Sequence, residues 1–421
     1  MLITNSFMVK NVFKKFTNDD GKFKETLTKD VQGLLSLYEA AHLIVHGEEI
    51  LEEALSFTVT HLWIDSSTAE AAIGLAIVKS MSPKLDNSLK AQVSEALFQP
   101  IHTNVPRVVA RKYVCIYENI ESHNDLLLKF AKLDFHILQK MHQRELRVYF
   151  GPQYKHARRT LTKLLVIITI TDDLYDAYAT YDELVPYTDA VERCDISAMD
   201  LISSYMRPLY QVLLDYFDEM EEELTKDGKA HYVYYAKIEM NKWIKSYLKE
   251  AKWLKDDIIP KCEEYKRNAT ITISIQMILI TCLIVAGEFI SNETFEWMIN
   301  ESLVAPASSL INRLKDDIIG HEHEQQREHG ASFIECYMKE YGASKQEAYV
   351  EAQRQIANAW KDINTDYLNA TQVPTFVLEP ALDLSRLANI LQEDDFTDSQ
   401  NFLKDMITLL FVDSVNSTSC G

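Results

Sequence analysis

Turn-forming residues are rare along this chain, and this scarcity limits the folds that it can adopt. Glycine occupies 11 of 421 positions and proline 10, whereas the usual level of glycine is about 7%. Tight turns and hairpins depend on these residues, so a fold with many short strands is disfavoured. The length suits two or three domains of about 150 residues each. We therefore expect an all-α protein with a core large enough to enclose a cavity.

Apolar residues recur at helical spacing near the N-terminus. One set runs from Val31 to Ala41 and a second from Leu51 to Leu62, with Gly47 between them. This spacing predicts two helices joined by a short turn. Further along, residues 344–347 have the Ser-x-x-Glu pattern of a capping box, which predicts the start of another helix.

A polar stretch from Glu118 to Asp125 separates helical patterns and is our best candidate for a domain boundary. We predict a partial N-terminal helical domain over residues 1–124. A second helical domain is expected over residues 125–421.

Acidic side chains outnumber basic ones, and this balance limits the partners. The chain has 63 Asp and Glu against 43 Lys and Arg, a formal net charge of −20, with no basic block. Nucleic acid and anionic membranes are disfavoured as partners. A protein of this charge needs metal ions to bridge it to a polyanionic substrate. Residues 1–10 lack the pattern of an export signal or a plastid leader, so we expect a cytoplasmic protein.

Residues 268–287 contain no charged side chain, and twenty residues is the length of a membrane-spanning helix. Polar residues nevertheless interrupt the stretch: Asn268, Thr270, Thr272, Ser274, Gln276 and Thr281. A helix buried on all sides in a large helical protein has the same composition. We expect such a core helix with a local break near Ser274, and no membrane span; the span stays open as the alternative.

Three carboxylates follow a mostly apolar helical stretch, residues 161–170. They belong to Asp172, Asp173 and Asp176. At 3.6 residues per turn, Asp172 and Asp176 share one face of a helix. Carboxylates at the end of a buried helix need compensation, and metal coordination would supply it. The alternative is an acidic helix end that faces water, because other Asp-Asp pairs occur in the chain.

A second acidic stripe has residues spaced three or four apart: Arg313, Asp316, Gly320, Glu324 and Arg327. Taken alone, it fits a solvated helix face with the ion pairs Arg313–Asp316 and Glu324–Arg327. Two acidic stripes together favour magnesium, which prefers oxygen ligands and leaves coordination positions for water and phosphate oxygens. Facing stripes with arginines would bind a diphosphate. His321 and His323 point in different directions and are expected to be exposed.

The sequence resembles the plant class I terpene synthases in both halves. Residues 34–42 (LLSLYEAAH) and 45–51 (VHGEEIL) are similar to the family's N-terminal domain. Residues 172–184 (DDLYDAYATYDEL) resemble its aspartate-rich DDxxD motif, and residues 312–327 resemble its second metal motif. Residues 360–364 (WKDIN) are also typical, so the resemblance covers nearly the whole chain.

The resemblance implies a C-terminal helical bundle that encloses the active site and binds three magnesium ions, for which manganese can substitute. Asp172 and Asp176 would bind two ions, with Asp173 orienting them. Asp316 and Glu324 would bind the third. These ions act as Lewis acids on the leaving diphosphate, so the allylic carbon–oxygen bond can ionise.

The same resemblance implies that Arg313 binds the substrate diphosphate together with the metal-bound carboxylates of Asp172, Asp176 and Asp316. Residues 272–275 resemble a broken helix whose carbonyls face the cation. The sesquiterpene-forming branch is the most similar, which implies farnesyl diphosphate as substrate, sesquiterpenes and diphosphate as products, and a monomeric lyase. Geranyl diphosphate is the alternative substrate.

Several positions depart from the family pattern. Gly320 replaces a Ser or Thr, and Phe396 replaces a pocket tyrosine. After Leu146, about 30 residues of the family are missing, roughly eight turns of helix that include an arginine pair and a tryptophan. Little or no cyclase activity is therefore expected, and a second hypothesis stays open: a catalytically inactive homologue from a truncated or alternatively spliced gene.

Overall fold

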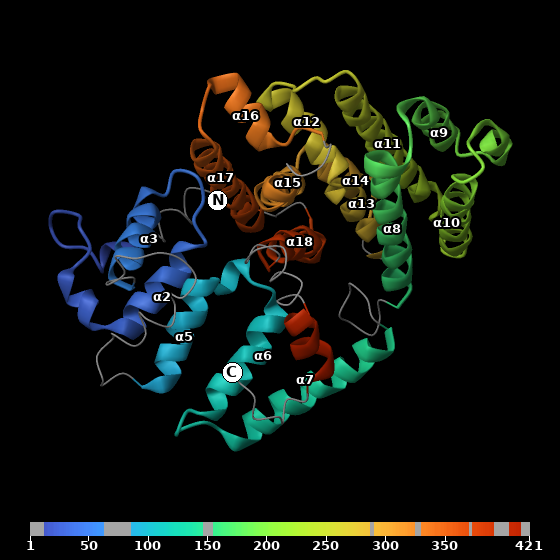
Figure 1. The fold of residues 1–421 in the computed structure, drawn as a ribbon. Helices are drawn as coiled ribbons and strands as arrows, with labels where there is room; N and C mark the ends of the chain where they lie inside the picture. The colour runs from blue at the N-terminus through green and yellow to red at the C-terminus, as the bar shows by residue number, and fades with distance from the viewer. Residues whose placement is uncertain are drawn as a thin grey trace. The chain divides into compact units, whose positions relative to one another are not determined.

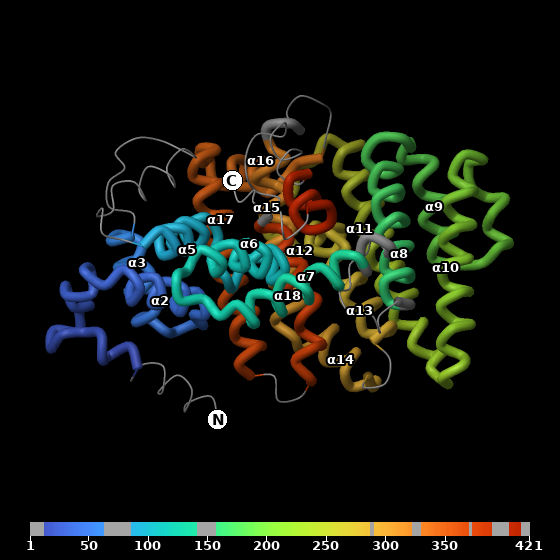
Figure 2. Tube along the Cα trace, turned by 90° about the horizontal axis from the view of Figure 1, so that it is seen from below, coloured from blue at the N-terminus to red at the C-terminus, as the bar shows by residue number. Residues whose placement is uncertain are grey.

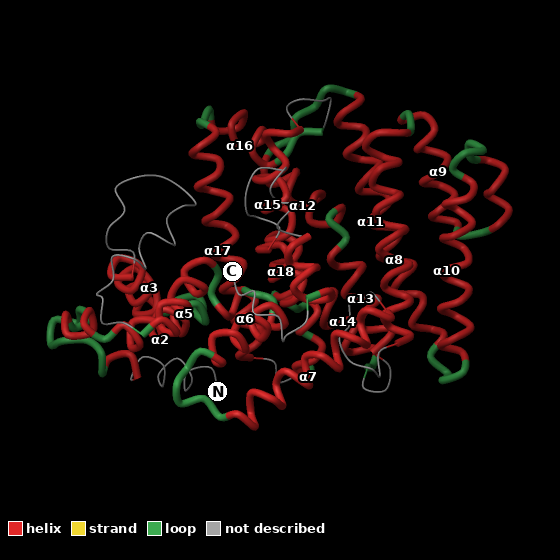
Figure 3. The backbone as a smooth tube through the Cα atoms, turned by 60° about the horizontal axis from the view of Figure 1, so that its bottom comes forward, coloured by secondary structure: helices red, strands yellow, loops and turns green. Residues whose placement is uncertain are grey.

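The computed structural model describes residues 12–62, 86–145, 155–286, 290–324, 330–369, 373–390 and 404–413. Within these residues the regular structure is helical (Figure 3), and the one pairing of extended chain is an isolated bridge between Thr17 and Phe23. The all-α prediction is confirmed. By their contacts, the residues form two compact units. Unit 1 is Met1–Arg144, Tyr367–Asn369 and Asn389–Gly421, and unit 2 is Glu145–Asp366 and Ala370–Ala388.

Unit 1 contains most of the N-terminal helices and the C-terminal turn. They are η1 (Glu25–Lys29), α2 (Val31–Ala41), α3 (Glu49–Leu62), α5 (Asn87–Phe98), η2 (Ile101–Thr103), α6 (Pro106–Glu118), α7 (Asp125–Glu145) and η8 (Thr408–Val412). The two predicted N-terminal helices are α2 and α3, which pack together. Gly47 has a φ of +83° in the turn between them, where a side chain would be strained.

The helix α2 contributes to two apolar clusters because its buried residues cover both sides of the helix. Leu37 and Ala41 pack with Leu51 and Ala54 of α3. Another cluster has Leu34, Leu35, Tyr38, Leu62, Val93 and Ala96. The position of Val93 and Ala96 in α5 means that the second cluster joins three helices.

Unit 2 contains the longest helices. They are α8 (Lys155–Asp173), η4 (Leu174–Tyr178), α9 (Tyr181–Arg193), η5 (Ile196–Leu201), α10 (Arg207–Thr225), η6 (Ala230–Tyr232), α11 (Val233–Lys255), α12 (Cys262–Thr272), α13 (Ile275–Ala286), α14 (Asn292–Asn300), α15 (Val304–Glu324), α16 (Phe333–Tyr341), α17 (Lys345–Asn369), η7 (Thr375–Val377) and α18 (Glu379–Ile390). The predicted capping box opens α17, where the Ser344 amide donates to Glu347 at 2.8 Å.

The helix α13 makes its most extensive contacts with three helices of unit 2. It packs against α8, α11 and α15, and α12 packs against α11, α15 and α16 (Figures 1 and 2). Nine of the twelve residues of α13 are buried. The stretch Cys262–Ala286 is long and apolar enough to cross a membrane, but 67% of its most apolar window is buried inside the protein. It is therefore a core element, as the sequence predicted.

The predicted break in this stretch is confirmed. The helix α12 ends at Thr272, and Ser274 has a φ of +64° before α13 begins. Positive φ is uncommon for a residue other than glycine. The break leaves carbonyl groups at the end of α12 without helical partners, and the indole Nε1 of Trp243 donates to one of them, Thr272 O, at 3.0 Å.

Candidate active site

The first acidic motif lies where α8 passes into a π turn. The Ala179 amide donates to the Leu174 carbonyl at 3.0 Å, which is the wider hydrogen-bond pattern of that turn. Asp172 and Asp176 are four residues apart, which is slightly more than one α-helical turn of about 3.6 residues. A wider turn contains more residues, so it reduces the angle between the two side chains. The local backbone therefore keeps Asp172 and Asp176 near one face.

Asp172 is half-buried and in contact with α11, because the Tyr247 hydroxyl donates a hydrogen bond to its Oδ1. Burial raises the pKa of Asp172, while the Tyr247 hydrogen bond and the nearby charge of Arg313 lower it. The negative charge of Asp316 raises it further. Residues of α15 are thus close enough to act electrostatically on the end of α8.

Asp173 and Asp176 are both exposed, but Asp173 turns toward a different space. It lines a cavity of about 570 Å³. The other lining residues are Ile170, Leu174, Tyr178, Glu183, Tyr205, Met206 and Leu209. The structure therefore brings Asp172 next to the second motif and places Asp173 beside a separate, mostly apolar cavity.

Arg313 lies at the centre of the second motif, with its side chain 17% exposed. It pairs with Asp316, the ion pair expected under the alternative of a solvated helix face, and its Nε lies 2.9 Å from Oδ1 of Asp317. The two partners differ in exposure, since the Asp316 side chain is 59% exposed and the Asp317 side chain only 1%. Asp316 is therefore available to a ligand, whereas Asp317 is the buried counter-ion of Arg313.

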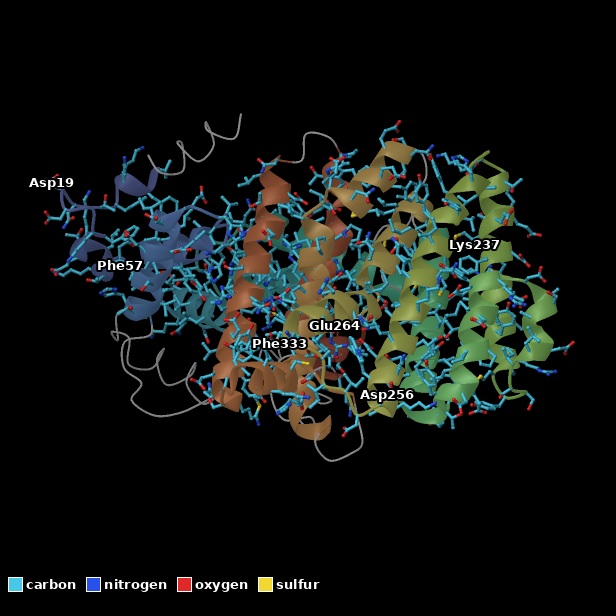
Figure 4. The ribbon with its side chains drawn as sticks, turned by 90° about the horizontal axis from the view of Figure 1, so that it is seen from above. Asp19, Phe57, Lys237, Asp256, Glu264 and Phe333 are labelled. Carbon is cyan, nitrogen blue, oxygen red and sulfur yellow. The ribbon has the colours of Figure 1, made fainter. Side chains whose placement is uncertain are left out.

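Both oxygens of Asp317 accept hydrogen bonds from neighbouring helices. The Tyr265 hydroxyl lies 2.8 Å from Oδ1 and 2.9 Å from Oδ2, and the Phe333 amide donates to Oδ2 at 3.1 Å. Figure 4 labels Phe333 at the start of α16, and its ring is fully buried. Burial raises the pKa of Asp317 to about 6, although Arg313 favours the charged form.

Glu250 of α11 is a further acidic residue at this site. Its Oε1 accepts hydrogen bonds from Asn268 Nδ2 at 3.0 Å and from Thr272 Oγ1 at 2.9 Å. Burial raises its pKa to about 7, and the charges of Arg313 and Asp176 also act on it. Glu250 therefore links the helix break to both acidic motifs.

Sequence reasoning did not identify Tyr247, Glu250, Tyr265 or Asp317. The first three come from α11 and α12, whose periodicity says nothing about which motif they face. Asp317 did carry a signal, because it lies four residues after Arg313, the spacing of a helical ion pair.

His321 was expected to be exposed, and this prediction is wrong. Its side chain is 7% exposed, and its Nδ1 lies 2.9 Å from Oε1 of Glu335. A neighbouring carboxylate on α16 thus allows the imidazole to be buried. The side chain of His323 lies outside the part of the chain that the structure describes. The same is true of Arg327, Phe396 and the segment that follows Leu146.

The described carboxylates could supply only part of the ligand set of a magnesium ion. Within the described part of the chain, no group of three or more His, Cys, Asp or Glu side chains could hold an ion by itself. Glu324 is the last residue of α15, and its side chain is outside the described set. Asp172, Asp176 and Asp316 offer oxygen donors from three elements, α8, η4 and α15, and Mg²⁺ typically takes only one or two carboxylates while phosphate and water complete its shell. The donor set therefore leaves coordination positions on each ion for water and for a phosphorylated ligand.

The chain belongs to the terpene synthase family. Residues 127–362 match the model of the terpene synthase metal-binding domain, and residues 4–97 match that of the terpene synthase N-terminal domain. Members of this family are lyases that act on diphosphates. The fold class and both sequence resemblances are thereby confirmed.

Similar proteins come from the nightshade genus and beyond. The chain is 80% identical to sesquiterpene synthase 14a of Solanum habrochaites, covering 99% of this chain and 78% of that protein. It is 51% identical to an (E,E)-germacrene B synthase of the same species, covering 97% of this chain and 79% of that protein. The first alignment has 446 positions against a chain of 421 residues, so at least 25 positions of the relative have no counterpart here.

Solved structures agree with the fold. Isoprene synthase from grey poplar, in complex with three Mg²⁺ ions and dimethylallyl-S-thiolodiphosphate, superposes with a TM-score of 0.85 at 27% identity. That match covers 95% of this chain and 80% of the poplar chain. A limonene synthase superposes equally well, with a TM-score of 0.85 at 26% identity, covering 95% of this chain and 78% of that one.

Proposed function

We propose that this terpene synthase binds magnesium ions through Asp172, Asp176, Asp316 and Glu324, and binds the substrate diphosphate through Arg313. The observation that carries the proposal is the electrostatic coupling of Asp172, at the end of α8, with Arg313 and Asp316 of α15. Three ions are proposed because the similar poplar isoprene synthase holds three. Asp173 is proposed to orient the ions that Asp172 and Asp176 bind.

The chain's own residues have distinct tasks in this reaction. Arg313 can donate charge-assisted hydrogen bonds to phosphate oxygens, which are stronger than neutral ones. Asp317 keeps the guanidinium in place from the buried side. The bound ions would act as Lewis acids on the departing diphosphate. The apolar helix α13 lies next to α8 and α15, so a hydrocarbon chain there would be shielded from water.

Farnesyl diphosphate is the proposed substrate because the most similar relatives named above are sesquiterpene synthases. The products are then sesquiterpenes and diphosphate, with geranyl diphosphate as the alternative substrate. We further propose a monomer in the cytoplasm, with a domain boundary between residues 124 and 125.

The experiment measures Mg²⁺-dependent diphosphate release and volatile products from farnesyl, geranyl and geranylgeranyl diphosphates. Asp172→Asn and Asp316→Asn remove ligand charge without changing volume, so each should abolish release while the helical circular dichroism is unchanged. Asp256→Asn is the matched control, because Asp256 belongs to an Asp-Asp pair at the exposed end of α11. Equal turnover in EDTA and in magnesium contradicts the mechanism, and no release from any substrate supports the inactive homologue.

A second experiment tests the effect of the segment that is missing after Leu146. A version of the chain with a family-like segment restored after Leu146 should give a higher yield of cyclic products than the chain itself. The physical reason is that additional helix closes the cavity against water, which otherwise quenches the cation. Equal cyclic yields from both versions would show that the shorter chain is already complete.

A further inference from the structure

Each acidic motif of unit 2 is held by a buried tyrosine from a neighbouring helix. Tyr247 of α11 donates to Asp172 of α8, and Tyr265 of α12 donates to Asp317 of α15. Both tyrosines are only 5% exposed. A tyrosine hydroxyl has an ordinary pKa of about 10, so both are protonated donors at neutral pH.

The ring of Tyr247 is fixed by aromatic contacts on two sides. Trp243 meets it edge to face with ring centroids 5.1 Å apart, and Tyr175 lies tilted at 5.5 Å. Trp243 is itself 1% exposed and hydrogen-bonded to the Thr272 carbonyl at the helix break. A continuous set of contacts therefore connects the end of α12 with the carboxylate of Asp172.

Tyr265 acts on Arg313 through Asp317. Both oxygens of Asp317 lie within 2.9 Å of the Tyr265 hydroxyl, and the Phe333 amide binds the same carboxylate. With these bonds and the Arg313 ion pair in place, Asp317 is not free to bind a metal ion. Its position sets the direction of the guanidinium, which faces Asp316 with its Nη2.

We propose that Tyr247 and Tyr265 are positioning residues with separate tasks: Tyr247 orients Asp172 for metal binding, and Tyr265 orients Arg313, through Asp317, for diphosphate binding. This inference rests on the proposed roles of Asp172 and Arg313. Residues that hydrogen-bond to metal ligands orient them, and their loss typically weakens metal binding by about 10- to 100-fold. The two tyrosines should therefore affect two different binding constants.

The test uses the full chain and two measurements. Electron paramagnetic resonance gives the dissociation constant of Mn²⁺ alone, and calorimetry gives that of inorganic diphosphate at saturating Mn²⁺. Tyr247→Phe is expected to weaken Mn²⁺ binding by about 10-fold or more. Tyr265→Phe is expected to leave Mn²⁺ binding within about twofold and to weaken diphosphate binding by about 10-fold, since a hydrogen bond to a charged group is lost.

Tyr175→Phe is the matched control. Tyr175 is also 5% exposed and contacts Tyr247, but its hydroxyl bonds to Thr188 Oγ1 at 2.7 Å, away from Asp172. It should change neither constant. If Tyr265→Phe melts at a much lower temperature, Asp317→Asn provides the second variant, because it keeps the volume and should weaken diphosphate binding in the same way.

Asp172→Asn separates failure of the inference from failure of the proposed function. If Asp172→Asn leaves Mn²⁺ binding unchanged, the metal assignment of Asp172 is wrong. If Asp172→Asn weakens Mn²⁺ binding but Tyr247→Phe does not, the positioning role of Tyr247 is overturned. If both tyrosine variants weaken Mn²⁺ binding and diphosphate binding equally, the structure as a whole is disturbed. That result would also overturn the proposal that the two tyrosines have separate tasks.

Discussion

The candidate active site and the helix α7 depart from the usual distribution of side chains in opposite ways. The site in unit 2 buries charge, since Asp317 is 1% exposed and Arg313 only 17%. The helix α7 in unit 1 exposes large apolar side chains, with Leu126 79% exposed and Phe130 67%. Leu133 and Ile137 are exposed as well, which makes a stripe along one face.

The two regions differ in whether a partner compensates for the unusual placement of the side chains. Every buried charge described at the site has a partner of opposite charge or a hydrogen-bond donor, which offsets the cost of removing it from water. On α7, the packed face holds Leu128, Phe135 and Gln139, whose Nε2 donates to the carbonyls of Leu410 and Asp413. The opposite face is apolar but exposed. One helix can thus contain both a well-anchored face and an uncovered one.

The largest effect is expected from comparing two phenylalanines of α7. Phe135 is 3% exposed, and the guanidinium of Arg107 lies 4.0 Å from its ring centroid, whereas Phe130 is on the exposed face. Phe135→Ala should lower the free energy of unfolding by about 3–5 kcal/mol. Phe130→Ala should change it by about 0.5 kcal/mol or less. Urea unfolding measures both, and similar losses would mean that the exposed face is covered in solution.

A smaller effect is expected from comparing a buried and an exposed ion pair. Arg313→Met leaves the buried Asp317 without its cation and should cost about 3 kcal/mol, because removal of one partner of a buried pair is strongly destabilising. Arg354→Met removes the cation of the Arg354–Glu351 pair, whose arginine is 61% exposed, and should cost less than about 1 kcal/mol. Thermal unfolding at neutral pH measures the loss of stability in both variants. A small loss of stability in Arg313→Met would show that Asp317 takes up a proton readily.

The smallest effect is a pH dependence at Glu250. Its pKa is raised from 4.5 to about 7, so the unfolded chain releases this proton at lower pH than the folded protein does. Stability is therefore lost as pH rises from about 4.5 to 7 and then stays constant. Glu250→Gln still accepts the bonds from Asn268 and Thr272, so the variant should gain up to about 3 kcal/mol over wild type at pH 8, since each pKa unit corresponds to about 1.4 kcal/mol. An equal difference at pH 4 and pH 8 would contradict a buried, titrating carboxyl.

Sequence reasoning identified what is encoded within single helices. The helices α2 and α3, the turn at Gly47, the capping box at Ser344 and the break near Ser274 all follow from local periodicity and residue preference. The same is true of the Arg313–Asp316 pair, whose members are one helical turn apart. These features depend on neighbours within about four residues, so the sequence shows them directly.

Features that depend on packing between helices were not accessible. Nothing in the sequence of α11 indicates that Tyr247 meets Asp172, and nothing in α15 indicates that His321 finds Glu335 on α16. The wider turn at Leu174–Tyr178 was also missed, because an aspartate-rich sequence is compatible with an ordinary helix. Tertiary contacts decide these positions, and periodicity identifies a face without identifying its partner.

The π turn after Asp173 has a consequence for insertions and deletions in this motif. Such a turn accommodates one more residue than an α-helix would over the same path. Deleting one residue between Leu174 and Tyr178 would allow the chain to continue as an ordinary α-helix with little cost to the backbone. A deletion at Leu174 or Tyr175 would place Asp176 three residues after Asp172, about 60° short of a full turn of an α-helix. The loss of a single codon would therefore keep the fold and alter the angle between the two candidate metal ligands of this motif.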